Sequence, residues 1–543
     1  MRIFILYIIF YGLAIDAAVA QFSTDVANLQ KSISPFGEGR GEENVSVSKP
    51  KDNRNFLPLT PSRGGKAACS NRELTIKKKT AQLTLNEIIN LAKNQSIAAR
   101  QATTQKETAY WQYRSYLSNY KPQLTLSGTL PNFNRSFQEV IQENGTIKFQ
   151  RVTNNNSDLT FALSQSIAAT GATVFVRSQL QRFDAFDRNF KLYNGLPIGI
   201  GIEQPLFAFN PLKWDKKTEP LRFEESKQAY VESLEQIGVT AANRFFEFLI
   251  AQVNLQIAES NLSNNDTIYK IALERFNLGK ISKNDLLQLR LGVLQSKKSA
   301  ASAQQNLEIA DLQLKSYIAY REEEQIELVL PTQIPDFQID ATQALQEAFV
   351  NRGDAIGFKR RTLEAERKVD KAKGENGFQA KIFAAFGLSN SAVNVGDVYK
   401  SPKDGETFNI GFEIPIMDWG RSKSRMATAK ANQQLVGYEV EQDRIVFEEE
   451  IYTLITLFNM LKDQVALSKE ADEIAAERYE IAKNRFFIGN LSITDLTIAL
   501  QEKDQAKRDY IFSLQDFWRT WLNIRMKTLY DFERQQKILY VAN

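Results

Sequence analysis

RFNLGKISKNDL, at residues 275–286, recurs as RFFIGNLSITDL at residues 485–496. The two stretches share Arg, Phe, Gly, Ser, Asp and Leu in one register, about 210 residues apart. The same register aligns GIEQP at residues 201–205 with GFEIP at residues 411–415. A constant register over this distance indicates that a whole structural unit is duplicated. The content of one unit therefore decides the fold.

Residues 1–20 are typical of a signal peptide that is removed on export. Arg2 precedes the apolar stretch FILYIIFYGLAI, and Ala18-Val19-Ala20 provides a cleavage site of small residues. A membrane anchor is the alternative, but the apolar stretch is short for a span. Residues 21–81 are polar and aperiodic, which predicts a flexible N-terminal arm.

The composition excludes several classes of function. The chain has 68 basic and 64 acidic residues among 543, interspersed, so no basic face for nucleic acid is expected. Histidine is absent, which removes Ser-His and Cys-His catalysis. No phosphate-binding glycine loop or metal-ligand cluster is present, so we expect no enzyme activity and no cofactor. Cys69, the only cysteine, allows no intrachain disulfide, and it lacks the apolar run that precedes a lipid-attachment site.

Ordered structure is predicted to begin near residue 82. Thr84 and Glu87 form a capping box, and one helix is expected from there to about Asn119. The periodicity then changes to two, in QLTLSGTL (123–130), DLTFALSQSI (158–167) and PIGIGIEQPL (197–206), and again around residues 382–388 and 408–416. Such alternation is typical of transmembrane β-barrel strands, although a strand on a soluble core has the same pattern. The polar face would include Gln123, Thr125, Glu203 and Glu413.

Each set of strands precedes a helix of unusual length, from about Leu212 to Leu278 and from about Arg421 to Ile488. About 65 helical residues extend about 100 Å, and apolar stripes at spacing four indicate coiled-coil-like packing. The alternative is a periplasmic structural coiled-coil protein without a pore.

The repeated motif predicts a sharp reversal between two helices. Gly279 and Gly489 suit a left-handed residue after a helix end, and Ser282 and Ser492 suit N-caps. Asp285 and Asp495 stand at the capping-box position. The return helices are expected to reach about Ala319 and Lys527. Four apolar residues at these tips are expected to be exposed, which suggests a partner surface: Leu278, Ile281, Ile488 and Leu491.

This layout resembles the TolC-type outer-membrane efflux protein family, over about residues 82–530. The duplicated tip and the two strand-to-helix junctions carry the resemblance. The second junction keeps Pro415, Ile416, Asp418, Gly420 and Arg421, whereas the first keeps Pro205, Leu206 and Phe207 but lacks the Asp, Gly and Arg.

The resemblance implies an α+β membrane protein that forms a homotrimer. Its strands would close one transmembrane β-barrel in the outer membrane, continued by a long periplasmic α-helical coiled-coil barrel. The expected organisation is a first repeat at 82–330, with barrel strands in 122–207 and a tip at 276–286. A second repeat at 331–530 has strands in 378–416 and a tip at 486–496, and a C-terminal tail follows at 531–543.

The implied function is passive export from a periplasmic adaptor and an inner-membrane pump, in tripartite efflux or type I secretion. The adaptor would bind at the tips, which also include Lys280 and Asn490. Asp495 matches an aspartate that rings the closed aperture in the family, although it also suits a helix cap. The family's other gate positions are occupied here by Phe486, Leu491 and Ile498, which predicts a more apolar aperture.

The two copies differ in length between their strands. The first copy holds about 48 additional residues, which contain one further alternating pair around a tight turn at Ala168–Gly171. We expect six strands per protomer if this pair joins the barrel with its turn on the periplasmic side. The alternative is that the additional hairpin forms an extracellular cap.

Overall fold

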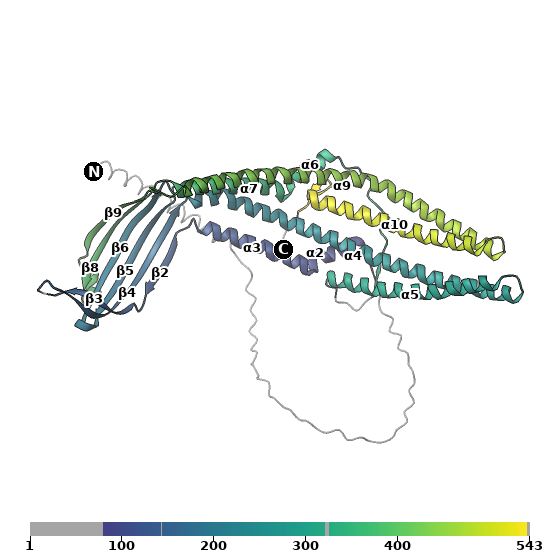
Figure 1. The fold of residues 1–543 in the computed structure, drawn as a ribbon, viewed down its shortest axis with the longest axis horizontal. Helices are drawn as coiled ribbons and strands as arrows, with labels where there is room; N and C mark the ends of the chain where they lie inside the picture. The colour runs from purple at the N-terminus through teal and green to yellow at the C-terminus, as the bar shows by residue number, and fades with distance from the viewer. Residues whose placement is uncertain (1–79, 143, 321–324, 540–543) are drawn as a thin grey trace, which may run out of the picture. The chain divides into compact units, whose positions relative to one another are not determined.

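The computed structural model describes residues 80–142, 144–320 and 325–539. The predicted signal peptide at 1–20, Cys69 and the predicted arm up to residue 79 lie outside these ranges. None of the described helices combines the length and the apolar character that a membrane crossing requires. Figure 1 shows a β-sheet at one end of the described part, followed by long paired helices that end in two turns.

The order of elements repeats along the chain. The first copy consists of β1 (Thr80–Leu83), α2 (Leu85–Gln95), α3 (Ile97–Ser118), β2 (Gln123–Thr129), β3 (Phe133–Ile141), β4 (Ile147–Ile167), β5 (Ala172–Ala185), η1 (Phe186–Arg188), β6 (Phe190–Leu206), α4 (Pro211–Asn277) and α5 (Lys283–Tyr317). The second copy consists of β7 (Gln325–Leu328), α6 (Ala341–Asn351), α7 (Gly353–Asn376), β8 (Gln379–Ala392), α8 (Val395–Val398), β9 (Lys403–Glu413), α9 (Arg421–Phe487) and α10 (Ile493–Thr528). The short strands β10 (Tyr530–Asp531) and β11 (Gln536–Lys537) follow.

The long helices have equal lengths in the two copies. α4 and α9 each contain 67 residues, and α5 and α10 return with 35 and 36 residues. α4 continues through Pro220, a residue that is unfavourable in a helix interior. Each long helix begins at the sheet and ends at a tip. At the rise of an α-helix, its 67 residues extend about 100 Å.

The prediction of one helix from residue 85 to about Asn119 is wrong. Ser96 separates α2 from α3, with an extended backbone (φ −62°, ψ 155°), and its side chain accepts a hydrogen bond from the N–H of Ala99. Ser96 therefore acts as the N-cap of a new helix, which a periodic apolar pattern alone does not reveal. The second copy has the equivalent break at Arg352, between α6 and α7.

The predicted start of the first repeat and the predicted end of the second repeat require correction. Thr80 and Ala81, assigned to the flexible arm, belong to β1, which pairs in parallel with β7. The segment after residue 530, assigned to a tail, includes β10 and β11, and Phe532 and Ile538 are buried. Parallel pairing between segments about 245 residues apart is non-local, so no local pattern predicts it.

The main sheet is antiparallel, with the strand order β2-β4-β5-β6-β8-β9. The predicted additional pair, β4 and β5, lies within this path, and its turn at Ala168–Gly171 faces the helices, where Asn210 Nδ2 donates to the carbonyl of Ala168 at 2.8 Å. The path therefore has six strands, and the alternative of a separate cap for this pair is wrong. β3 was not predicted; it continues β2 along the same edge of β4.

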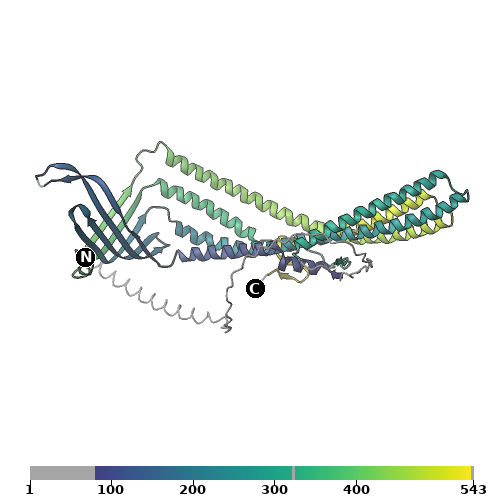
Figure 2. The same cartoon turned by 90° about the horizontal axis from the view of Figure 1, so that it is seen from below.

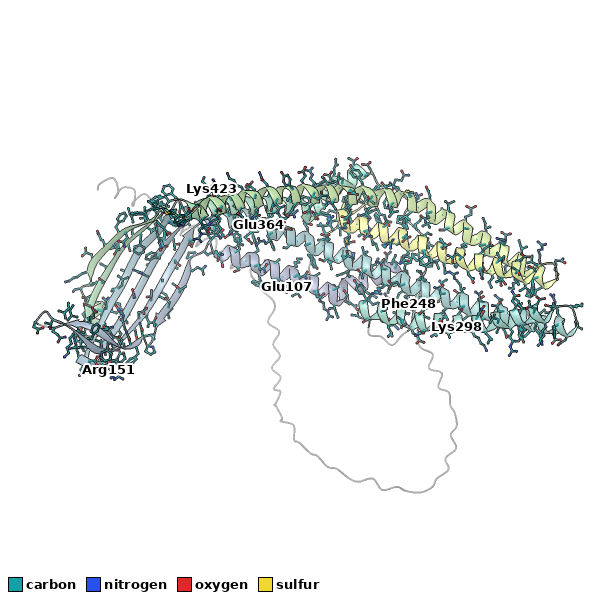
Figure 3. The ribbon with its side chains drawn as sticks, in the orientation of Figure 1. Glu107, Arg151, Phe248, Lys298, Glu364 and Lys423 are labelled. Carbon is teal, nitrogen blue, oxygen red and sulfur yellow. The ribbon has the colours of Figure 1, made fainter. Side chains whose placement is uncertain are left out.

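β3 and the first part of β4 form a hairpin that extends beyond the other strands (Figure 2). Arg151, labelled in Figure 3, lies in this hairpin, far from the helices. The two edges of the sheet are β2 and β9, and each has a partner on one side only among the described strands. Every residue of β2 and β9 is exposed in the single protomer.

The largest hydrophobic core lies where the helices of both copies meet. Phe245 and Phe246 of α4, Phe458 of α9 and Phe517 of α10 are almost completely buried in it. Phe458 and Phe517 have ring centroids 5.2 Å apart. Phe248, labelled in Figure 3, belongs to the same cluster. This core joins the two repeats into one body.

A buried ionic network crosses the same core. Glu235 of α4 is fully buried and its carboxylate lies 2.7 Å from Lys93 Nζ and 3.5 Å from Arg525 Nε. Arg525 also pairs with Asp531. Burial lowers the pKa of Lys93, and the Glu235 carboxylate opposes this shift. A Cβ at Gly238 would lie 2.9 Å from Lys93 Cε, so glycine gives the lysine its path to Glu235.

We predict that Glu235→Ala destabilises the protein by about 3 to 5 kcal/mol, because two half-buried cations lose their shared, fully buried counter-ion. Urea unfolding of the detergent-solubilised protein, followed by far-ultraviolet circular dichroism, measures this loss. Glu224→Ala on the same helix removes an exposed pair with Lys227 and is the matched control, expected to cost less than about 1 kcal/mol. Equal losses in the two variants would contradict the structural role of Glu235.

Candidate functional site

The first tip closes by the predicted turn chemistry. α4 ends at Asn277, and Gly279 has φ +71°, a left-handed conformation that glycine adopts without strain. Ser282 Oγ accepts from the N–H of Asp285 at 3.1 Å, and Asp285 Oδ2 accepts from the N–H of Ser282 at 3.3 Å. This reciprocal pair starts α5, so the capping-box prediction is confirmed.

The second tip has the same backbone. Gly489 has φ +87°, and Ser492 Oγ accepts from the N–H of Asp495 at 3.1 Å. The Ser492 hydroxyl also donates to Asp495 Oδ2 at 2.7 Å. The N–H of Ser492 does not donate to Asp495, so the capping box predicted for the second tip is not completed. The Asp495 carboxylate stays exposed to solvent. Both roles considered for Asp495, cap and aperture charge, are compatible with this position.

The apolar residues of the tips differ in exposure. Leu278 and Ile488 are 70% and 71% exposed, as expected for a partner surface. Ile281 and Leu491 are half-buried, and Leu491 packs against the second tip's own hydrophobic cluster. The expectation that all four residues are exposed is therefore wrong for these two.

The residues considered for an aperture are not equivalent either. Ile498 is exposed on α10, but Phe486 is only 6% exposed. Its ring packs in a cluster with Ile268, Tyr479, Ala482, Leu496 and Ala499. The ring is therefore part of the tip's core in this protomer, because three helices converge around it.

One arginine connects the two tips. Arg275, in the last turn of α4, donates from Nη2 to the carbonyl oxygen of Phe487 at 2.9 Å. Its guanidinium carbon lies 5.7 Å from the centroid of the Phe486 ring. The acceptor is one of the carbonyls that a helix end leaves without an intrahelical partner, and the negative end of the helix dipole favours a cation there. The repeat makes Arg275 recognisable in the sequence, but no local pattern predicts this contact between the two tips.

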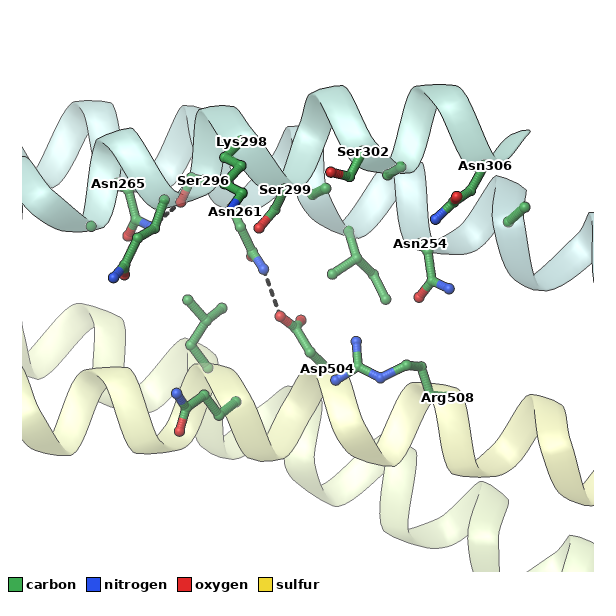
Figure 4. Close-up of a pocket in the computed structure, with 18 of the residues that line it drawn as sticks. Asn254, Asn261, Asn265, Ser296, Lys298, Ser299, Ser302, Asn306, Asp504 and Arg508 are labelled. Carbon is green, nitrogen blue, oxygen red and sulfur yellow. Dashed lines mark hydrogen bonds between the residues drawn. The ribbon is translucent and has the colours of Figure 1, made fainter. Parts of the chain in front are cut away.

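A polar groove of about 1330 Å³ lies above the tips, between α4, α5 and α10. Figure 4 shows Asn261 of α4 directed at Asp504 of α10, with Nδ2 and Oδ2 2.5 Å apart. Asn265 Nδ2 donates to Ser296 Oγ at 2.7 Å within the same hairpin. The sequence does carry a signal for this groove, because Asn and Ser recur at inward positions of the long helices, but the groove was not predicted.

The faces of the sheet separate by chemistry, as the alternation predicts. Cross-strand pairs such as Leu126 with Phe161, and Ile200 with Phe386, place large apolar residues on one face. This apolar face consists of Leu124, Leu126, Leu159, Phe161, Leu163, Val174, Val176, Ile198, Ile200, Ile202, Ile382, Ala384, Phe386, Phe408, Ile410 and Phe412. The opposite face carries Gln123, Thr125, Glu203 and Glu413, the four polar residues named from the sequence.

The opposite face also bears an ion pair and two aromatic rings. Glu203 Oε1 and Lys381 Nζ lie 2.6 Å apart across β6 and β8. Phe175 stacks with Phe383 at 5.9 Å between centroids, over Gly201, where a Cβ would lie 2.4 Å from the Phe175 ring. Glycine at 201 therefore allows the Phe175 ring to lie flat on this face.

At the second strand-to-helix junction, the residues that resemble the family segment cap the helix. Asp418 accepts from the N–H of Gly420 at 3.0 Å and from the N–H of Ser422 at 2.8 Å. Hydrogen bonds from Ser422 and then from Gly420 lower the pKa of Asp418. Gly420 has φ +86°, and Arg421 is the first residue of α9. Pro415 lies in the exposed link that follows β9.

At the first junction, different residues cap the long helix. Pro205 lies in β6, opposite Lys381 of β8. Asn210 caps α4 by accepting from the N–H of Lys213 at 3.2 Å, and Pro211 is the first helical residue. Asn210 was missed in the sequence, although Asn before Pro is a recognisable helix start.

The described residues contain no group of three or more His, Cys, Asp or Glu side chains arranged to hold a metal ion. The features described above are surfaces: the two tips, the groove, the junctions and the two faces of the sheet.

We predict that Ser492→Ala weakens the start of α10 by about 1 kcal/mol, because the N–H of Asp495 loses its acceptor. Hydrogen exchange of the Asp495 and Leu496 amides, which donate to Ser492, should become roughly five-fold faster. Thr494→Ala removes a hydroxyl from the same turn that has no cap bond, so it should leave the exchange unchanged. Equal acceleration in both variants would contradict the capping role.

Comparisons with known proteins agree with this architecture. The chain is similar to the outer membrane protein VceC from Vibrio cholerae, with 14% identity, a TM-score of 0.57, and coverage of 84% of this chain and 97% of that chain. It is similar to the CmeC outer membrane channel from Campylobacter jejuni, with 16% identity, a TM-score of 0.58, and coverage of 84% and 87%. It is also similar to CusC, with 17% identity, a TM-score of 0.58, and coverage of 82% and 91%.

At sequence identities this low, the structural similarity shows a shared fold alone. No curated protein matches the sequence. The family model described as "Outer membrane efflux protein" matches residues 88–319 and 381–525, which is more than half of the chain and includes both copies of the tip. The chain therefore belongs to the outer membrane efflux protein family.

Proposed function

We propose that three copies of this chain form the outer-membrane channel of a tripartite export system. The channel passively conducts substrate from a periplasmic adaptor and an inner-membrane pump to the exterior. Family membership supports the export role, and the sheet is the single observation that carries the channel. Its apolar face bears large exposed side chains, as a lipid-facing surface requires.

The edges of the sheet support closure by association. β2 and β9 each lack a partner on their outer side among the described strands, and lipid does not satisfy unpaired backbone groups. β2 runs away from the helices and β9 runs toward them, so β9 of one copy can pair antiparallel with β2 of the next. Three six-strand paths would close a barrel of about 18 strands, with the polar face lining a wide pore.

A stripe on α9 supports the same assembly in the helical part. Met460, Leu467, Ile474, Ile481 and Ile488 recur at heptad spacing and are 53% to 71% exposed. Their counterparts in the first copy include Ile250, Ile257 and Ile271 of α4, which are half-buried. α4 packs against α10 of its own protomer, whereas α9 and α5 each retain a free side. α9 therefore fits against α5 of a second copy, which exposes Leu287, Leu291 and Leu294.

The tips are the proposed docking surface for the adaptor, at the end of the helices opposite the membrane. The surface comprises Leu278, Gly279, Lys280, Ile281, Ser282, Ile488, Gly489, Asn490, Leu491 and Ser492. Leu278 and Ile488 supply most of its exposed apolar area. Asp495 and Ile498, both exposed on the first turns of α10, are the proposed aperture residues, with Leu491 beside them.

The alternative of a structural coiled coil without a pore leaves the apolar face of the sheet without a role. The outer component of a type I secretion system uses the same duct with a different pump, and no observation on this chain favours it over efflux. The chain's contribution is a water-filled path and its gate, while the pump supplies the energy.

We predict that Leu467→Glu combined with Ile474→Glu prevents trimer formation, because it places two carboxylates in an apolar helical seam. Light scattering of the detergent-purified protein measures the mass of the complex. Lys469→Glu lies between these positions but on a different face of the same helix, so it is the control and should leave the trimer intact. A trimer that survives the seam substitutions would contradict this interface.

We predict that single channels of the purified protein in planar bilayers conduct in discrete steps and prefer cations, because the Asp495 carboxylates form a ring of like charge. Asp495→Asn keeps a hydrogen-bond acceptor for the Ser492 hydroxyl but removes the charge, so the preference should disappear while the helix remains capped. Conductance with an unchanged preference would limit Asp495 to the cap, and a protein that does not conduct would contradict the proposed channel.

A further inference from the structure

The duplicated tip motif contains two arginines with different surroundings. Arg275 of the first copy donates to the carbonyl of Phe487 at 2.9 Å and lies over the Phe486 ring. Arg485 occupies the same motif position in the second copy, but it is exposed and has no bonded partner among the described residues.

The matching acceptor is also open. Phe487 corresponds to Asn277 in the register of the repeat, as Phe486 corresponds to Phe276. The carbonyl of Asn277, at the end of α4, accepts no hydrogen bond from the described residues. One Arg–carbonyl bond is thus complete within the protomer, and both halves of a second bond remain available.

The two halves are presented in the same local geometry as the complete pair. In the first tip, the N–H groups of Leu278, Gly279 and Lys280 donate to carbonyls three to five residues earlier, at 3.1, 2.9 and 2.9 Å. In the second tip the equivalent bonds measure 3.3, 3.0 and 2.9 Å. Because the backbone caps are alike, the carbonyl at 277 and the Cα–Cβ bond of Arg485 leave their helix ends in the same directions as the carbonyl at 487 and the Cα–Cβ bond of Arg275.

We propose that Arg485 donates to the carbonyl of Asn277 in the neighbouring copy of the chain. The site is incomplete in one protomer and is completed by the partner copy. It rests on the proposed trimer, in which α9 packs against α5 of the next copy as α4 packs against α10 of its own. The ring of tips is then held by identical clamps that alternate within and between protomers.

The physical basis is the same for both clamps. A helix C-terminus concentrates partial negative charge on carbonyls without intrahelical partners, and an arginine satisfies one of them while its guanidinium covers an aromatic ring. Phe276 is half-buried in the single protomer and is available for that contact. Closed symmetric assembly of a repeated unit requires that each unit meet the next through the same surfaces.

Cross-linking of the full-length protein tests this inference. In a Cys69→Ser background, Arg485→Cys is combined with Asn277→Cys and treated with a bifunctional thiol reagent that has the reach of an arginine side chain. The expected result is covalent trimer on a denaturing gel. Arg275→Cys with Phe487→Cys is the matched control, which should be cross-linked within one protomer and so retain the monomer mass.

A second control separates register from simple proximity. Arg485→Cys with Asp266→Cys places the acceptor thiol about 16 Å higher on α4, so covalent trimer should be lost. A trimeric mass in detergent with no cross-link at 277, or with equal cross-linking at 266, would overturn the Arg485 clamp and leave the channel proposal standing. The absence of a trimer before cross-linking would instead overturn the assembly itself.

Discussion

Backbone hydrogen bonding at the edges of the sheet is the constraint on which the rest of the structure depends. A strand at an edge presents unpaired N–H and C=O groups, and in a bilayer these groups find no water. β2 and β9 both present such an edge, beside a face of large apolar residues. In the proposed channel, each of these edges pairs with an edge of another copy, so that the backbone groups of β2 and β9 gain partners. In that proposed assembly, the long helices follow the same symmetry as the sheet.

The internal duplication makes this closure simple. Each copy supplies strands, a long helix, a tip and a return helix, so one protomer already contains one interface between repeats, α4 against α10. The exposed stripe on α9 corresponds to a surface of α4 that is half-buried within the protomer. The copies differ in the sheet, to which the first adds β4 and β5. They also differ in their exposed apolar stripes, which lie on α5 in the first copy and on α9 in the second. The buried Glu235 network and the phenylalanine core fix the two copies together where they meet.

Local chemistry explains which parts of this fold could be predicted from the sequence. The tips could be predicted because Gly489 and Ser492 shape the turn through contacts with residues close to them in the sequence. The strands could be predicted because period-two alternation is a local signal. The six-strand path followed from comparing the lengths of the two copies. The pairing of β1 with β7 was missed because it depends on a distant partner. The hairpin of β3 with β4 is local, but Arg135 and Glu139 interrupt the apolar alternation of β3. The break at Ser96 was missed because a cap within a periodic segment looks like part of one helix. For the candidate site, the sequence identified Asp495 and the tip glycines. It did not reveal that Phe486 is buried, because burial there depends on the convergence of α4, α9 and α10.

The most direct test of this account is electron cryomicroscopy of the detergent-purified protein, viewed along the axis of the assembly. The account predicts a three-fold particle in which about 18 strands form one closed ring around a pore, with β9 of each protomer paired to β2 of the next. A monomeric particle, or an oligomer whose β2 and β9 edges remain unpaired, would contradict it.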